Sequence, residues 1–363
     1  MGKSISDKER NSAIDLSKFV MAVFVVAIHV RPFSGKLAFL VDDCITRLAN
    51  PLFFTISSYF LFYGLEKGRV KEGSKKWNAK ALLPFIKRIL ILYTVWFMLN
   101  LPNFKWQIMF NGMEMLPIRL FQAYFLSGPF DTALWFLPAL LWGGLLTFLI
   151  GRASKPQVAF AVGFLLHLLS LFDGDYHVFV ENMAWFENLV DMFEMIFLWL
   201  ANGFTYGLCY CALGACIAVE NVRRDEQFRE RKKECRMRFG AWMLLFLVLY
   251  VVECVLIKWR QLGEGFGAQF MMIPFSYFCL QFLLLVEIKE RLIYRFLQKM
   301  SIVIFGVQFL VIYGFRNLLA GCAWYVESTT VQFVIVLGVT CAIAAAVVWL
   351  SEHTRLKFLK CMY

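Results

Sequence analysis

Long apolar runs recur along the whole sequence, and they constrain the fold more than any other feature. Each run has about 17 to 25 residues, the length that crosses a bilayer as an α-helix. The mean hydropathy is +0.63, and only 17% of the 363 residues are charged, far less than in a soluble protein of this length. We therefore predict an all-α, polytopic integral membrane bundle that forms a single domain over residues 1–363. About ten transmembrane helices are expected, at residues 14–31, 39–62, 81–101, 133–150, 157–172, 196–219, 239–257, 267–286, 301–319 and 331–350.

Basic residues divide unevenly between the two sides that these spans define. With the N-terminus placed in the cytoplasm, the inner segments hold 29 of the 37 Lys and Arg residues. The outer segment 173–194 has six acids and no Lys or Arg. This asymmetry follows the positive-inside rule, so both termini are expected to be cytoplasmic. The net charge of +11 then reflects orientation and contact with the lipid bilayer, and nucleic acid is not an expected partner.

The first span contains three ionisable residues, Asp15, Lys18 and His29, in an otherwise apolar helix. At about 100° per residue, the three side chains fall within about 60° of one another around the helix. Charged side chains within a membrane protein face the bundle interior or a water-filled cavity, so this stripe is predicted to line such a space. Lys18 lies near the cytoplasmic mouth and His29 near the outer surface, a rise of roughly 16 Å along the helix.

The same residues also have structural interpretations. Asp15 and Lys18 can form an ion pair at the membrane edge, with Lys18 extending toward water. His29 can be an interfacial side chain without a chemical role. The ten cysteines form no CxxC motif and no Cys/His pairing with zinc spacing, so neither a metal site nor a permanently bound cofactor is expected.

The first span and several later segments together resemble the acyltransferase-3 family, membrane-bound enzymes that O-acylate cell-envelope carbohydrates. That family has a basic residue, ten intervening positions and a histidine in its first helix. Lys18 and His29 match this spacing, and Asp15 matches an acid commonly found three residues earlier. Collinear matches follow along nearly the whole chain: "NPLFFTISSYFLF" (50–62), "PFIKRILILYTVW" (84–96), "ALWFLPALL" (133–141), "NGFTYGLCYCALG" (202–214) and "SIVIFGVQ" (301–308).

The sequence also departs from the family pattern. Ile91 stands where relatives often have a second arginine, three residues after Arg88. Phe305 replaces the usual tyrosine, and Gln308 replaces the usual histidine. These differences concern the third and ninth helices and leave the first helix untouched.

The resemblance implies acyl transfer from cytoplasmic acyl-CoA, most often acetyl-CoA, to a hydroxyl of an envelope carbohydrate outside. It also implies a multi-pass protein of the bacterial cytoplasmic (inner) membrane. Donor binding is expected from Lys18, Lys87 and Arg88, because cations at the inner mouth can hold the phosphates of the donor. His29, with Asp15 and Lys18, is expected to be catalytic, as a general base or as a covalent acyl carrier.

Four further residues are candidates for a role beside His29. Asp42, Asp43 and Arg47 lie at the start of the second span, on the outer side. They are expected to orient His29, and Arg47 either pairs with an aspartate or polarises the thioester oxygen. Trp135, in the segment "ALWFLPALL", is a candidate for contact with the acceptor.

Transport of a small solute is the main alternative function. The stripe of Asp15, Lys18 and His29 suits a path for protons or substrate. Many transporters, however, have internal repeats with Gly- or Pro-broken helices in matched halves, and the sequence has neither. A membrane scaffold or sensor would not need the stripe. Acyl transfer is therefore the favoured interpretation.

Overall fold

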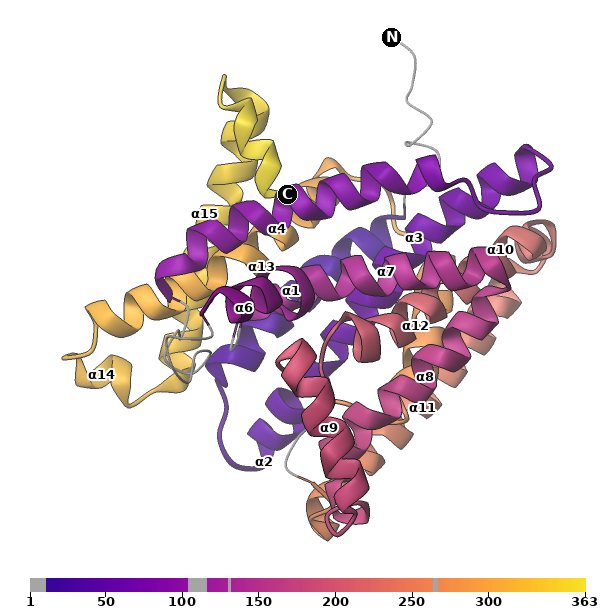
Figure 1. The fold of residues 1–363 in the computed structure, drawn as a ribbon. Coiled ribbons are helices and arrows are strands. Elements are labelled where there is room, and N and C mark those ends of the chain that lie inside the picture. The colour runs from indigo at the N-terminus through magenta and orange to yellow at the C-terminus, as the bar shows by residue number, and fades with distance from the viewer. Residues whose placement is uncertain (1–10, 104–115, 130–131, 264–266) are drawn as a thin grey trace.

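The computed structural model describes residues 11–103, 116–129, 132–263 and 267–363, which form a helical bundle without strands (Figure 1). The long helices are α1 (Ser12–Val30), α3 (Ala49–Lys71), α4 (Leu83–Asn100), α7 (Phe136–Ala153), α8 (Pro156–Asp173), α10 (Leu208–Glu230), α11 (Lys232–Arg260), α13 (Leu292–Leu318) and α15 (Thr329–His353). The shorter ones are α2 (Gly35–Ala38), α6 (Leu116–Phe121), α9 (Ala184–Phe197), α12 (Met272–Leu285) and α14 (Ala323–Val326). Short π- and 3-10-helical segments cover Phe39–Cys44, Ile45–Leu48, Ala79–Leu82, Leu101–Asn103, Gln122–Ser127, Ala133–Trp135, His177–Phe179, Gly203–Gly207 and Lys357–Met362.

The helices confirm the predicted all-α polytopic fold. Within the described residues, nine helical stretches are long and apolar enough to cross a membrane, and each overlaps one of the predicted spans. The tenth predicted span, 267–286, corresponds to α12, an apolar helix of 14 residues. At about 1.5 Å per residue this helix is shorter than the hydrocarbon core of a bilayer.

The sixth span begins later than the sequence predicted, at Gly203 instead of residue 196. Leu198 has a left-handed backbone conformation, with φ of 67°, which ends α9 and turns the chain. Asn202 then starts the next helix, because its side-chain oxygen accepts hydrogen bonds from the amides of Phe204 and Thr205 at 2.8 and 3.3 Å. An apolar run that reads as continuous in sequence is therefore two elements joined by a turn.

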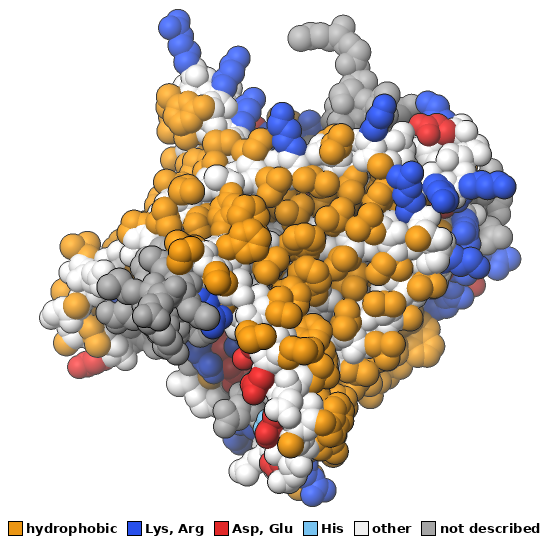
Figure 2. Space-filling view, viewed as in Figure 1, with side chains coloured by type: hydrophobic (Ala, Val, Ile, Leu, Met, Phe, Trp, Pro, Cys, Tyr) orange, Lys and Arg blue, Asp and Glu red, His pale blue; other side chains and the backbone are white. Residues whose placement is uncertain are grey.

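Charge is distributed unevenly over the surface. In Figure 1 the α3–α4 and α10–α11 connections and the end of α15 lie toward the top, whereas α2, α9 and α14 lie lower. Figure 2 shows most Lys and Arg side chains along the upper and upper right edges, acids near the lower end, and a broad apolar face between them. This arrangement agrees with an orientation in which the upper edge faces the cytoplasm.

Helices α4 and α13 approach closely where a tryptophan packs on a glycine. Trp96 is only 1% exposed, and a Cβ atom built on Gly306 would lie 2.1 Å from its ring atom Cδ2. Asn100 donates to the Gly306 carbonyl at 3.1 Å, and the Trp96 indole donates to the Met362 carbonyl at 3.1 Å. These contacts fix the backbone of α13 and dock the C-terminal segment on α4.

Reporter fusions test the orientation. A reporter placed after Glu181 should lie outside the cytoplasm, and one placed after Glu230 should lie inside, because basic connections stay on the cytoplasmic side. A paired reporter that is active on only one side of the membrane measures both. An inside signal at Glu181 would overturn the topology.

Substitution of Gly306 tests the α4–α13 contact. Gly306→Ala forces Trp96 to move, and it should destabilise the protein by about 1 to 3 kcal/mol, as overpacking usually does. The apparent unfolding temperature of purified protein in detergent measures this effect. Gly314→Ala on the same helix is the control, because nothing lies within 4 Å of its added Cβ. Equal unfolding temperatures of the two variants would contradict the expectation.

Candidate active site

Two cavities lie within the bundle and meet at one side chain. The inner cavity, of about 450 Å³, is lined by residues of α1, α3, α4, α7 and α13. The outer cavity, of about 410 Å³, is lined by residues of α1, α3, α8, α9 and α13 and by connecting segments. Phe305 lines both cavities, and its ring packs edge-on to that of Phe136, with centroids 5.5 Å apart. Both volumes fall in the range of about 300 to 1,000 Å³ that is usual for small-molecule sites.

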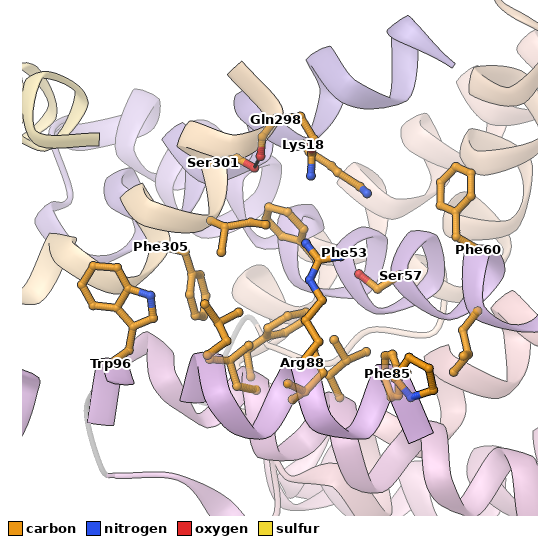
Figure 3. Close-up of a pocket in the computed structure, with 18 residues that line it drawn as sticks. Lys18, Phe53, Ser57, Phe60, Phe85, Arg88, Trp96, Gln298, Ser301 and Phe305 are labelled. Atoms are coloured by element: carbon orange, nitrogen blue, oxygen red, sulfur yellow. Dashed lines mark hydrogen bonds between the residues drawn. The ribbon is translucent and has the colours of Figure 1, made fainter. Parts of the chain in front are cut away.

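The inner cavity brings together two of the three predicted donor-binding cations. Arg88 extends from α4 into the cavity, and Lys18 and Gln298 project from the opposite side (Figure 3). The Lys18 ammonium lies 5.2 Å from the centre of the Phe60 ring, within the range of a cation–π contact. Ser57 and Ser301 add hydroxyls, and the remaining walls are mostly apolar. Two cations in a largely apolar cavity suit an anionic ligand with an uncharged arm.

Lys87 and Asp15 lie outside this cavity. Lys87 is exposed and does not line it. Asp15 is 8% exposed and lines a separate cavity of about 200 Å³ with Arg291 and Arg295. The predicted stripe on α1 is therefore shared among three spaces, and the roles of Lys87 in donor binding and of Asp15 in catalysis stay predictions.

The outer cavity combines His29 with two of its four predicted neighbours. His29 comes from the last turn of α1 and packs edge-on against Phe309, with ring centroids 4.6 Å apart. Arg47 comes from the 3-10-helical segment before α3, and Trp135 comes from the 3-10-helical segment before α7. The Nε atom of Arg47 is buried and makes no hydrogen bond to the residues that the structure describes. An unsatisfied buried donor beside a cavity is typical of a ligand site.

Asp42 and Asp43 instead hold the connection that follows α1. The Asp43 carboxylate forms an ion pair with Arg31 at 2.6 Å. Asp42 accepts a hydrogen bond from the amide of Phe33 at 3.2 Å. Neither aspartate lines the outer cavity. Their contacts fix the position of the segment just after His29, and their role in orienting its ring stays a prediction.

Three acids of the outer cavity were not predicted as site residues. Asp173, Asp175 and Glu194 line it together with His29. All three belong to segment 173–194, whose acids had indicated only orientation. Asn50, Trp199 and Tyr206 complete the polar and aromatic lining. A dense group of acids within an outer loop was the one signal in the sequence that pointed to them.

Buried hydrogen bonds hold the loops of the outer cavity in place. The Gln122 amide donates to the carbonyls of Met195 and Ile196 at 2.7 and 2.9 Å, which caps the end of α9 beside Glu194. Asp175 accepts from the Ala268 amide at 2.8 Å and from the Gln269 side chain at 3.0 Å. The cavity wall is thus tied to elements far apart in the chain.

Known proteins were compared with this chain. A sequence profile of the acyltransferase-3 family, described as an acyltransferase domain, matches residues 11–349. The chain is also similar to an amino-acid racemase of Enterococcus faecalis, with 24% identity over 67% of this chain and 32% of the racemase. A serine/alanine racemase of Enterococcus gallinarum is 27% identical over 67% of this chain and 33% of its own length. The matched region is thus about a third of each racemase, and their named activity is not carried over to this chain. No solved structure matches.

The pH dependence of stability tests the burial of Asp175. Burial raises the pKa of its carboxyl from 3.8 to about 6, so between these values the folded protein retains a proton that the unfolded chain releases. Stability should therefore fall as the pH rises from about 4 to about 6. Asp175→Asn should flatten this part of the curve of unfolding temperature against pH. Glu181→Gln, at an exposed acid of the same loop, should leave the slope unchanged, and equal slopes in all three proteins would refute the assignment.

Proposed function

Because the chain belongs to the acyltransferase-3 family, we propose that it moves an acyl group from cytoplasmic acyl-CoA to a hydroxyl of a carbohydrate outside. Acetyl-CoA is the proposed donor, and the bacterial cytoplasmic membrane is the proposed location. The family match supports an acyltransferase with a carbohydrate-type acceptor, and the many apolar helices support a multi-pass membrane protein.

One observation carries the proposal: a cavity with two cations and a cavity with a histidine meet at Phe305. Lys18 and Arg88 belong to the inner cavity, on the side of the basic connections. His29 belongs to the outer cavity. In this proposal, a thioester held from the inner side passes the ring of Phe305, which lines both cavities, to come near His29.

The inner cavity fits the donor by charge and by polarity. CoA carries several phosphate charges, which Lys18 and the planar guanidinium of Arg88 can hold. The uncharged pantetheine arm then lies along apolar side chains such as Phe53 and Leu61. This arrangement leaves the thioester as the part of the donor that reaches Phe305.

The outer cavity supplies a base and a cation. In direct transfer, the acceptor hydroxyl oxygen attacks the thioester carbon while the His29 imidazole removes its proton. The new ester C–O bond forms, the C–S bond breaks, and the proton passes from His29 to the departing thiolate of CoA. In this proposal Arg47, which lines the same cavity, stabilises the negative charge that develops on the carbonyl oxygen. An acyl-histidine route uses the same groups, with His29 attacking first.

Two variants separate donor binding from chemistry. His29→Ala should reduce transfer of labelled acetyl groups to envelope carbohydrate by at least about 100-fold, the usual contribution of a general base, while acetyl-CoA binding persists. Arg88→Gln should weaken acetyl-CoA binding by about tenfold or more, as expected for loss of a charge-assisted hydrogen bond. Binding to purified protein and transfer in membranes are measured side by side.

Transport of a small solute, the alternative function, gives a different result when labelled acetyl groups are followed in membranes. Uptake of a solute without transfer of label would indicate a transporter. Full transfer by His29→Ala would remove the proposed mechanism. Lys87→Gln is the control for Arg88→Gln. Because the Lys87 side chain lies outside the inner cavity, this substitution should weaken acetyl-CoA binding less.

A further inference from the structure

The outer cavity has an excess of negative charge. Its walls contain the carboxylates of Asp173, Asp175 and Glu194. Arg47 is the one lysine or arginine among the lining residues that the structure describes. The nearby Asp43 carboxylate does not alter this balance, because it is paired with Arg31. A ligand that enters this space meets more anionic than cationic groups.

One of these carboxylates, that of Asp175, is buried in the cavity wall and uses only one of its two oxygen atoms in hydrogen bonds to the described residues. Asp175 is 1% exposed, and its Oδ2 atom accepts the bonds from Ala268 and Gln269. Its Oδ1 atom is buried and accepts no hydrogen bond from the described part of the chain. A buried acceptor without a donor destabilises the folded protein, because it has lost its hydrogen bond to water and gained none in return. A ligand that donates a hydrogen bond at this wall would offset this loss.

The other two carboxylates line the same cavity, and the charge of Asp173 acts on Glu194. Burial, and then the charges of Asp173 and Asp191, raise the pKa of Glu194. Such crowding of like charges disfavours an anionic ligand and favours a cationic one. The C-terminal end of α9, capped by Gln122, holds Glu194 in this position.

Aromatic side chains complete the same site. Trp135 and Trp199 line the cavity, and the Trp199 indole is fixed by a hydrogen bond to the Ser127 carbonyl at 3.2 Å. Indole faces attract cations and pack against the apolar faces of sugars. Carboxylates beside fixed tryptophans therefore suit a ligand that is both cationic and ring-shaped.

We propose that the outer cavity selects an acceptor with a protonated amino group, of the amino-sugar class, over neutral or acidic sugars. Its ammonium group binds among Asp173, Asp175 and Glu194, and its hydroxyl faces His29. The inference rests on the proposed function for the identity of the cavity as an acceptor site. It adds the charge of the acceptor, which the family match does not specify.

Binding of three related sugars tests this proposal without acyl-CoA. Glucosamine, glucose and glucuronate have similar rings and carry a positive, no or a negative charge, respectively. Their affinities are measured on the full chain in lipid nanodiscs, at a pH that keeps the amine protonated. Glucosamine should bind at least about tenfold more tightly than glucose, and glucuronate most weakly.

Matched variants on one helix assign the preference to the cavity. Glu194→Gln should reduce the preference for glucosamine by about tenfold, whereas Glu187→Gln, at an exposed position of α9, should preserve it. Asp173→Asn serves as a second test should Glu194→Gln fail to fold. Equal affinities, a preference for glucuronate, or no binding of any of the three sugars would overturn the inference.

The binding experiment tests the charge preference of the outer cavity separately from acyl transfer. A protein that transfers acyl groups but shows no charge preference would overturn this inference alone. A protein that prefers glucosamine but transfers no acyl group would overturn the proposed function and keep the selectivity of the cavity.

Discussion

The need to keep charged side chains away from lipid organises the whole bundle. A charge at the centre of a spanning helix costs about 2.5 to 3.5 kcal/mol even on the most lenient scales. Lys18, Arg88 and Arg47 each belong to a helical stretch apolar enough to span, and each lines a cavity. Carboxylates near the helix ends are paired instead, as Glu66 is with Arg69. The cavities thus exist where the spanning helices carry charge.

An aromatic divider separates the two polar spaces. Phe305 lines both the cavity with the two cations and the cavity with the histidine, and Phe136 of the inner cavity packs edge-on against it. The neighbouring Gly306 lies against Trp96, so the backbone that carries Phe305 has little freedom. Gln308 donates to the Phe305 carbonyl at 3.0 Å and adds to this constraint. The two departures from the family pattern on α13 thus lie at the divider, where phenylalanine provides an apolar ring without a hydroxyl.

The acids of the outer loops serve two physical purposes. In segment 173–194 they keep that side of the protein free of basic residues, which agrees with the orientation rule. Three of them also line the cavity that contains His29. Ala268 and Gln269 donate hydrogen bonds to the Asp175 carboxylate, and Gln122 donates to the carbonyls that follow Glu194, so loops as well as spanning helices shape this site. Such loops are a common place for binding residues on a rigid scaffold.

The sequence by itself determined the polar face of α1 and, among the described residues, nine of the ten expected spans, because length, hydropathy and helical angle are local properties of the chain. It missed the break before Gly203, which depends on the φ of Leu198 and the cap at Asn202. Lys18 and Arg88, and His29 with Arg47 and Trp135, were already expected to act together; only the tertiary structure showed that each group lines one cavity and that three carboxylates line the outer one. It also placed Asp15, Asp42 and Asp43 elsewhere. A cavity is enclosed by side chains from helices and loops far apart in the chain, and no local pattern encodes which of them come together.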